Sequence, residues 1–156
     1  MTIIEDTRQQ AEKHKLKHEY FDSHNIKVIR SKLPFGDYAL LTDLSTIIDT
    51  KQDLTEVCGN VCQQHKRFVA ECDKAEDAGI KLIILVEEDN ITCINDIFKW
   101  KNPRRFYSSK CVKGPQLAKM LHSIEVRHGV KFEFCKKSET GKKIVEILEG
   151  GLKCLN

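Results

Sequence analysis

Asp49, Thr50 and Lys51 place an acid and an amine two positions apart at the end of an apolar run. Side chains at positions i and i+2 of a strand share a face, so Asp49 and Lys51 should point together while Thr50 points away. An acid beside an amine at a strand end can hold a divalent cation and a phosphate oxygen at the same time. The pair taken alone is also typical of a solvated strand end.

Asp37 adds a second carboxylate. It follows the turn at residues 33–36 and opens the strand expected to pair with the one that carries Asp49. Pairing can bring the two acids together, although the sequence does not fix the register. Two close carboxylates repel each other unless a cation lies between them, so they indicate either a costly contact or a Mg²⁺ site. Asp6 can supply a third carboxylate to this sheet edge, cap a helix beginning near Arg8, or do both.

The elements that must position these residues follow from the spacing of apolar side chains. Strands are expected to end at residue 6 and to span residues 25–33, 38–41, 46–51, 81–88 and 130–135. Helices are expected over residues 8–23, 53–78, 114–129 and 138–151, with a long irregular segment at 89–113. This order predicts an α/β fold, a three-layer sandwich with a central mixed β-sheet flanked by helices.

Composition narrows the class of protein. A chain of 156 residues with 40% hydrophobic residues suits one domain with a single core, over residues 1–156. Its mean hydropathy is −0.41 and no apolar run approaches a membrane span. The start, MTIIEDTRQQ, lacks the features of a signal peptide, and seven cysteines favour a reduced cytoplasmic protein. A net charge of +3 permits a polyanionic partner without requiring one.

Two further groups of residues could bind a metal. Cys58, Cys62 and His65 have the spacing of half a zinc site, but all three fall inside one expected helix and no second pair repeats the spacing. Cys58 is better explained as a small core residue. His14 and His18 are four residues apart on an expected polar helix, an arrangement that more often marks a solvated face than a metal site.

Five stretches, in this order, resemble the nuclease domain of the XPF family, part of the PD-(D/E)XK nuclease group: IIEDTRQQ, LPFGDYAL, TIIDTKQDL, HKRFVAE and KLIILVEE. That family carries Gly-Asp, a variable gap, Glu-Arg-Lys and an Asp shortly after. The resemblance covers nearly the whole chain. It implies a restriction-endonuclease-like fold, an XPF-type nuclease core, in a stand-alone form similar to phage or bacterial proteins.

The chain departs from the family pattern at several positions. Asp49 stands where the signature has Glu, and Thr50 replaces its Arg. Gln9 replaces an acid of the first-strand motif, and Glu71 replaces a Gln of the helical motif. The downstream Asp falls two residues early, at Asp53. The carboxylate pair and the lysine are kept, so these changes affect the expected substrate preference more than the expected chemistry.

The resemblance implies a hydrolytic mechanism. Asp37 and Asp49 would ligate Mg²⁺ or Mn²⁺ together with the main-chain carbonyl of Thr50, and Asp6 would be a secondary ligand. The ion would polarise the scissile phosphate and lower the pKa of a bound water. Lys51 would orient that water or neutralise the developing charge.

Several cations away from the carboxylates are candidates for DNA contact. By resemblance, Arg8 and Arg67 would bind flanking phosphates through their forked guanidinium groups, with an ion pair as the alternative for each. The run KWKNPRRFY combines aromatic rings with the cations Lys101, Arg104 and Arg105. It fits a single-strand or junction contact, or equally a loop anchored to the core by Trp100 and Phe106.

The implied function is a metal-dependent DNA endonuclease that cuts flap, fork or junction DNA in recombination or repair, in the cytoplasm or nucleoid of a bacterial or phage-infected cell. From a length of 156 residues we expect neither a tandem helix-hairpin-helix domain nor a helicase. Affinity is therefore expected from a homodimer, a partner protein or the basic run. The alternatives are an inactive DNA-binding partner subunit with the same fold and a zinc-stabilised interaction protein. The retained Asp37, Asp49 and Lys51 favour cleavage.

Overall fold

The computed structural model describes residues 1–153, except for the side chains of Ala11 and residues 151–153. Six strands form one sheet in the order β2-β1-β3-β4-β5-β6. Their bounds are Thr2–Glu5, Lys27–Arg30, Tyr38–Leu40, Asp43–Lys51, Lys81–Glu87 and Lys131–Cys135 for β1 to β6. The pairs β1–β2, β4–β5 and β5–β6 are parallel, and β1–β3 and β3–β4 are antiparallel. The predicted mixed sheet is confirmed.

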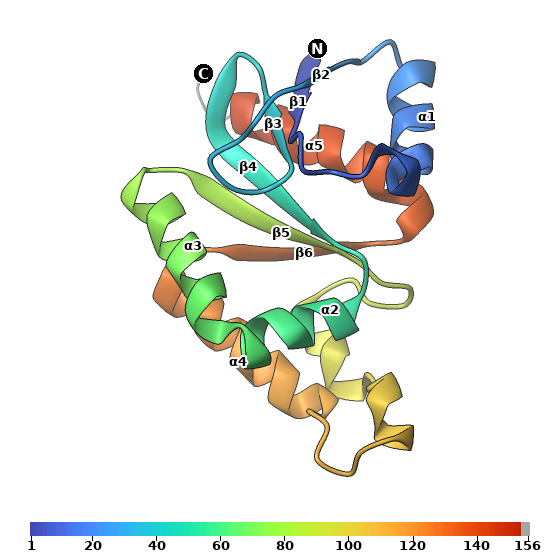
Figure 1. Cartoon of the computed structure of the whole chain (residues 1–156), viewed down its shortest axis with the longest axis vertical. Helices are drawn as coiled ribbons and strands as arrows, with labels where there is room; N and C mark the ends of the chain where they lie inside the picture. Colours follow the sequence, from blue (N-terminus) through green and yellow to red (C-terminus); the bar gives the residue numbers. More distant parts are fainter. Residues whose placement is uncertain (154–156) are drawn as a thin grey trace.

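Helices cover both faces of this sheet (Figure 1). They are α1 Lys15–Ser23, α2 Leu54–Cys58, α3 His65–Asp77, α4 Gly114–His128 and α5 Thr140–Lys153. Buried residues of α2, α3 and α4 pack in one core on one face, and those of α1 and α5 pack in a second core on the other. The prediction of a three-layer sandwich is confirmed, with two cores in place of the single core expected.

The two central strands bring the end of β4 to one edge of the molecule. Ile47 of β4 belongs to the first core and Ile48 to the second, because neighbouring side chains of a strand point to opposite faces. Strand β5, covered on both faces, is apolar along most of its length, as a central parallel strand should be. The parallel register pairs Lys51 with Val86, so β4 and β5 end at the same edge.

Helix α1 begins later than predicted. The expected helix over residues 8–23 is replaced by a turn, a 3₁₀ helix at Ala11–His14, and then α1. The cause is a local hydrogen bond, since the carboxylate of Asp6 accepts from the backbone N–H of Arg8 at 2.8 Å and so forms a turn where the helix was expected. The prediction that Asp6 caps this helix is therefore wrong.

The single helix expected over residues 53–78 is also divided. A π-helical turn at Gly59–Gln63 follows α2, and Gln64 separates it from α3. The backbone N–H of Gln64 reaches the carbonyl of Gly59, which widens the helix by one residue. The segment predicted to be irregular contains two 3₁₀ helices, η3 at Ile94–Lys99 and η4 at Pro103–Phe106. No described helix has the length and apolar character needed to cross a membrane.

Candidate active site

Strands β3 and β4 bring Asp37 and Asp49 to neighbouring positions, close enough for the charge of Asp37 to raise the pKa of Asp49. Their antiparallel register pairs Tyr38 with Ile48 and Ala39 with Ile47, so Asp37 and Asp49 occupy the next positions outward. The chain enters β3 through Gly36, whose φ of +66° favours glycine. A β-carbon at this glycine would lie 2.6 Å from Cγ2 of Ile47. The Gly-Asp pair is therefore a geometric requirement for bringing Asp37 onto β4.

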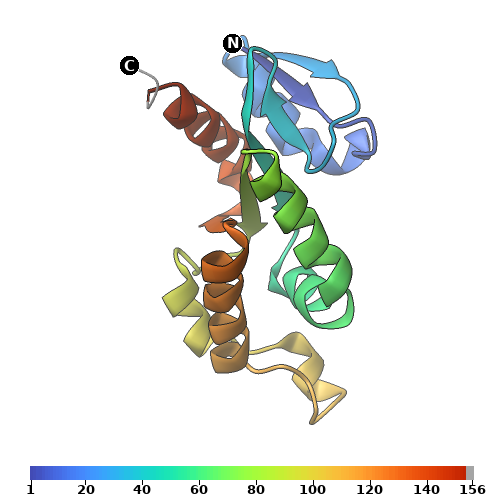
Figure 2. The ribbon, with the colours of Figure 1, turned by 90° about the vertical axis from the view of Figure 1, so that its left-hand side faces the viewer.

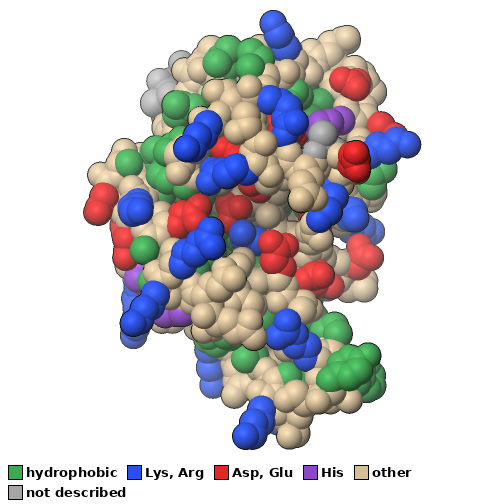
Figure 3. Space-filling model, viewed as in Figure 1, with side chains coloured by type: hydrophobic (Ala, Val, Ile, Leu, Met, Phe, Trp, Pro, Cys, Tyr) green, Lys and Arg blue, Asp and Glu red, His purple; other side chains and the backbone are tan. Residues whose placement is uncertain are grey.

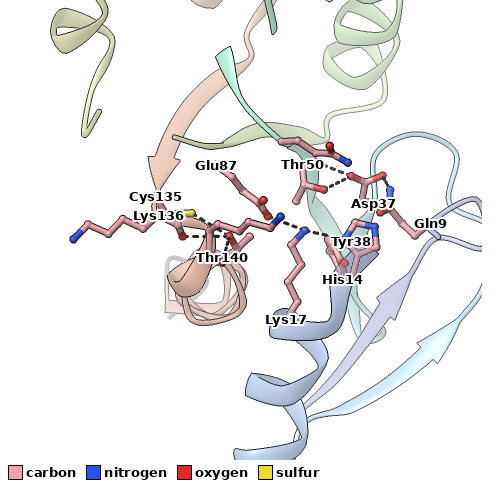
Figure 4. A network of polar contacts seen from close by, with 12 residues as sticks. Gln9, His14, Lys17, Asp37, Tyr38, Thr50, Glu87, Cys135, Lys136 and Thr140 are labelled. Atoms are coloured by element: carbon pink, nitrogen blue, oxygen red, sulfur yellow. Dashed lines mark hydrogen bonds and ion pairs between the residues drawn. The ribbon is translucent and has the colours of Figure 1, made fainter. Parts of the chain in front are cut away.

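A dense set of hydrogen bonds fixes Asp37 (Figure 4). Its Oδ2 accepts from the backbone N–H of Thr50 at 2.7 Å and from the Thr50 hydroxyl at 2.6 Å. Its Oδ1 accepts from the side-chain amide of Gln9. Its backbone N–H donates to the carbonyl of Ile48 at 2.7 Å. Thr50, expected only to contribute a carbonyl, thus ties β4 to Asp37 through its amide and side chain.

Asp49 and Lys51 form a close ion pair, as their shared face predicts. The Lys51 Nζ lies 2.8 Å from Oδ2 of Asp49, and both side chains are only 14% exposed. Burial raises the pKa of Asp49, and the negative charges of Asp37 and Glu71 raise it further, while Lys51 opposes them. The predicted solvated strand end is therefore not what the structure shows. An additional cation would therefore stabilise the ionised form of this buried carboxylate and offset the repulsion from its acidic neighbours.

The oxygen atoms of this site can be compared with the ligands that a divalent metal ion prefers. Within residues 1–153, no group of three or more His, Cys, Asp or Glu side chains is arranged to hold a metal. Mg²⁺ is commonly held by one or two carboxylates, with waters and substrate phosphates completing its octahedron. Asp37 and Asp49 supply the two carboxylates, and the backbone carbonyl of Thr50 is a third oxygen nearby in the chain. These residues fit a hydrated Mg²⁺ completed by substrate.

Asp6 lies close to this pair, but its carboxylate has other partners. It is 1% exposed and accepts from Nε of Arg8 at 2.6 Å and from the backbone N–H of Leu33 at 2.7 Å. Although burial raises the pKa of Asp6, these hydrogen bonds outweigh burial and hold it below its usual value. The arrangement favours a role for Asp6 in positioning Arg8, which is 59% exposed. Metal ligation by Asp6 stays a prediction.

A pocket of about 190 Å³ adjoins the ion pair. Four of the residues that line it are cations, and two are acids: Arg8, Lys13, Lys17 and Lys51, with Glu56 and Glu87. At the back of this pocket, buried Lys17 of α1 lies 2.8 Å from buried Glu87 at the end of β5 and 2.9 Å from Nδ1 of His14 (Figure 4). The excess of cations favours binding of a negatively charged sugar-phosphate backbone beside Lys51.

Sequence reasoning missed Lys17 and Glu87 as parts of this site. The available signal was the position of Glu87 at the end of the apolar run KLIILVE, beside the end of β4. It also treated Gln9 and Glu71 only as departures from a pattern. In the structure, Gln9 donates to Asp37, and the charge of Glu71 acts on both Asp49 and Arg8.

The other predicted cations lie elsewhere. Arg67 is an exposed residue of α3 and makes no ion pair with another residue in the described part of the chain. Lys101, Arg104 and Arg105 are exposed residues in and beside η4. Arg104 lines a pocket with Cys58 and Cys62 of the α2 region, away from Asp37. Trp100 packs against the core as expected, but Phe106 is 75% exposed, so the prediction that it anchors the segment is wrong.

The two alternative metal groups have other partners. The Nδ1 of His65 lies 3.0 Å from the carbonyl oxygen of Val61. Burial raises the pKa of Cys58 to about 12, which disfavours the thiolate that zinc requires. His14 contacts Lys17, and His18 lies 2.7 Å from Oε2 of the buried Glu5. The expected solvated face for these histidines is thus wrong, because both side chains turn toward the sheet.

Solved structures of other proteins share this fold. XPF from Aeropyrum pernix superposes with a TM-score of 0.65 at 16% sequence identity, covering 97% of this chain and 61% of that one. XPF from Aeropyrum pernix in complex with DNA gives a TM-score of 0.67 at 18% identity, covering 97% and 65%. The chain therefore spans less than two thirds of either protein, and the likeness shows the fold of the XPF nuclease domain.

No curated protein matches the chain. The family model described as the ERCC4 domain matches residues 5–147, a range that includes both carboxylates, Lys51 and all six strands apart from the first three residues of β1. This match over most of the sequence makes the chain a member of the ERCC4 domain family.

Proposed function

We propose that the chain is a divalent-metal-dependent DNA endonuclease that acts on branched DNA, at flaps, forks or junctions. The observation that carries the proposal is the convergence of Asp37, Asp49 and Lys51 at one sheet edge of an ERCC4 domain, beside a pocket rich in cations. A solved structure with this fold, XPF from Aeropyrum pernix, is a complex with DNA, which supports a nucleic acid as the substrate.

The residues of the site have distinct roles in the proposed hydrolysis. Asp37, Asp49 and the carbonyl of Thr50 would hold Mg²⁺ or Mn²⁺. Such an ion supplies a Lewis acid that polarises the phosphate and acidifies a water. Thr50 and Gln9 keep the carboxylate of Asp37 in one orientation through their hydrogen bonds. This preorganisation reduces the motion needed once DNA binds.

Lys51 would act on the reacting phosphate directly. Its ammonium group is held by Asp49 at 2.8 Å, at a position where it can orient the attacking water or neutralise charge on the phosphorane. Water would add to phosphorus as the bond to the leaving oxygen breaks, and the leaving oxygen would take up a proton. Arg8, held by Asp6, and Arg67 would bind phosphates on either side.

We also propose that the protein works in DNA repair or recombination in the cytoplasm of a bacterial or phage-infected cell, as a homodimer or with a partner protein. The basis is the resemblance of its motifs to the XPF family, and sedimentation at several protein concentrations tests self-association.

A cleavage panel tests the enzymatic proposal. Labelled duplex, flap, fork and four-way-junction DNA would be incubated with the wild-type protein and Mg²⁺ or EDTA, and with the variant Asp49→Ala. Asp77→Asn, an exposed acid at the end of α3, is the control for loss of a negative charge. We expect metal-dependent nicking of branched DNA by the wild type and by the control only. DNA binding without cleavage by any of the proteins would favour the inactive partner-subunit function instead.

A further inference from the structure

Residues 99–113 form a strongly basic segment, here called the basic segment. Between residues 97 and 124 the chain has seven Lys and Arg and no Asp or Glu, whereas the other 19 Lys and Arg are outnumbered by the chain's 23 Asp and Glu. The formal charge of +3 is therefore concentrated here, and the rest of the chain is net acidic. At the lower end of the molecule, Lys and Arg side chains lie beside hydrophobic ones with no acid in view (Figure 3).

Two aromatic rings project from the basic segment. Phe106 is 75% exposed and Tyr107 is 91% exposed, more than any other aromatic side chain among the exposed large hydrophobic residues described. The guanidinium carbon of Arg105 lies 4.2 Å from the centroid of the Phe106 ring, stacked over it. Exposed rings of this size lose the hydrophobic free energy that burial would supply. A pair of rings beside cations presents surfaces that suit a planar, negatively charged partner.

Hydrogen bonds from side chains to the backbone hold the turn in the basic segment. The buried side chain of Asn102 donates to the carbonyl of Val112 at 2.9 Å and accepts from the backbone N–H of Arg104 at 2.9 Å. Arg105 donates to the carbonyls of Lys101 and Asn102 at 3.2 and 3.1 Å. The rings are therefore presented by an ordered turn, which reduces the entropy lost when a ligand binds.

Its base is equally fixed. Trp100 packs against the core, and helix α4 begins at Gly114, where a β-carbon would overlap the carbonyl oxygens of Ile97 and Trp100. This close approach fastens the end of the basic segment to η3. The segment projects from one end of the molecule when the view is turned (Figure 2).

The fold connects the basic segment to the candidate active site. The chain leaves the sheet at the end of β5, which pairs in parallel with β4 and ends at the same edge as Lys51. The segment then lies beside the end of α2 and the π-helical turn that follows it, where Cys58, Cys62 and Arg104 line one pocket of about 240 Å³. Helix α2 itself begins three residues after Lys51. A DNA strand bound at the carboxylates can therefore continue along α2 toward the exposed rings.

We propose that the basic segment binds single-stranded DNA, with unpaired bases stacked on Phe106 and Tyr107 and with phosphates held by Lys101, Arg104 and Arg105. This rests on the proposed function, because the strand would be an unpaired arm of the branched substrate. Bases within a duplex are already stacked on each other, so exposed rings favour unpaired bases. Cations alone would bind duplex and single strands through phosphates without this preference.

The test measures binding in EDTA, so that cleavage cannot interfere. Fluorescence anisotropy would compare labelled oligodeoxythymidine with a blunt duplex, for the wild type and for Phe106→Ala/Tyr107→Ala. We expect the double variant to bind the single strand about tenfold or more weakly, since base–aromatic stacking contributes about 1–3 kcal/mol per base, and the duplex almost unchanged. Val126→Ala removes an equally exposed apolar side chain from α4 and should leave both affinities unchanged.

A second pair of substitutions separates charge from stacking. Lys101→Gln/Arg104→Gln leaves Arg105 over Phe106 and should weaken single-strand and duplex binding alike and reduce the dependence of affinity on salt. Trp100 is the only tryptophan of the chain, so a change in its fluorescence on titration with the oligonucleotide would place the bound strand at this segment. Thermal unfolding of every variant checks that the fold is kept.

Specific outcomes overturn the inference. These are equal loss of duplex and single-strand affinity in the ring variant, no loss of either, or a ring variant that changes oligomeric state, which would assign the rings to a protein interface. The nuclease proposal is judged separately by the cleavage panel. A wild type that cuts nothing, with rings that still govern single-strand binding, would refute the enzyme and keep this inference. Cleavage by the wild type, with single-strand binding unchanged in the ring variant, would keep the enzyme proposal and refute this inference.

Discussion

The ends of β4 and β5 around Asp49, here called the carboxylate edge, differ from the basic segment in how their charged side chains are held. At the edge, Asp49, Lys51, Lys17 and Glu87 are largely buried and hold one another in ion pairs of 2.8 Å. In the basic segment, the cations are exposed, and the turn that carries them is held by hydrogen bonds to the backbone rather than by opposite charges. A buried charge depends on its partner, whereas an exposed one does not. Substitutions at the edge should therefore affect chemistry and stability, and those in the segment should affect binding.

The largest expected difference concerns one lysine from each region. Lys51→Met should lower the cleavage rate at saturating branched DNA by about 10²–10³-fold, because the charge that faces the reacting phosphate is lost. Lys101→Met, the same change in the basic segment, should weaken DNA binding slightly and leave that rate unchanged. Single-turnover cleavage measures both. Equal rates for the two variants would remove Lys51 from the chemistry.

The next comparison concerns stability. Lys17→Met leaves Glu87 buried without its counter-charge, and breaking a buried pair in this way costs about 3–5 kcal/mol of unfolding free energy. Lys101→Met removes an exposed cation and should change the unfolding free energy by less than about 0.5 kcal/mol. Urea denaturation followed by circular dichroism gives both values.

Replacing both members of the buried pair isolates the cause. Lys17→Met/Glu87→Leu should recover most of the loss, because no unpaired charge remains. If the double variant is as unstable as Lys17→Met, packing rather than charge explains the effect.

Substitutions at two glycines should differ less in their effect on stability. Gly36→Ala places a β-carbon against Ile47 at a left-handed φ, which costs about 1–2 kcal/mol from the backbone alone, and it should also displace Asp37 and slow cleavage. Gly59 lies in the π-helical turn beside the basic segment, and a β-carbon added there would meet no atom within 4 Å. Gly59→Ala should stabilise the fold by up to about 1 kcal/mol. Thermal denaturation measures both changes in stability. The cleavage assay should show a slower rate for Gly36→Ala and an unchanged rate for Gly59→Ala.

The same two regions show how far the sequence could predict the structure. The mixed sheet and its helical layers followed from apolar periodicity, and the Gly-Asp turn with its apolar strands indicated that Asp37 and Asp49 lie on neighbouring strands. Periodicity records which face of an element is buried, and this was enough to predict the layers.

What failed were features set by single contacts that apolar periodicity does not record. The start of α1 depends on the carboxylate of Asp6 accepting from Arg8 and Leu33. The pairing of Lys17 with Glu87 joins residues 70 positions apart, and no local pattern marks a lysine as buried. Two rings of one segment also differ in a way that the sequence does not mark, since Trp100 packs against the core and Phe106 is exposed.

The smallest expected effect is a pH dependence of stability at the carboxylate edge. Burial lowers the pKa of His14, and the nearby charge of Lys17 lowers it further, against the opposing charges of Glu5, Asp37 and Glu87. The unfolded chain therefore takes up a proton on this histidine at a higher pH than the folded chain does. The stability from a neutral His14 is fully present above the unfolded pKa of about 6.5 and is lost as the pH falls below it.

His14→Gln should flatten this part of the profile, because a neutral amide can accept from Lys17 without titrating. Unfolding free energies between about pH 7 and about pH 5 would be compared for the wild type, His14→Gln and His122→Gln, the last an exposed histidine on α4. A wild-type slope that persists in His14→Gln would assign the acid sensitivity to another group. A slope lost only in that variant would show that the buried edge responds to protons through the partner of Lys17, a sensitivity that the exposed cations of the basic segment cannot have.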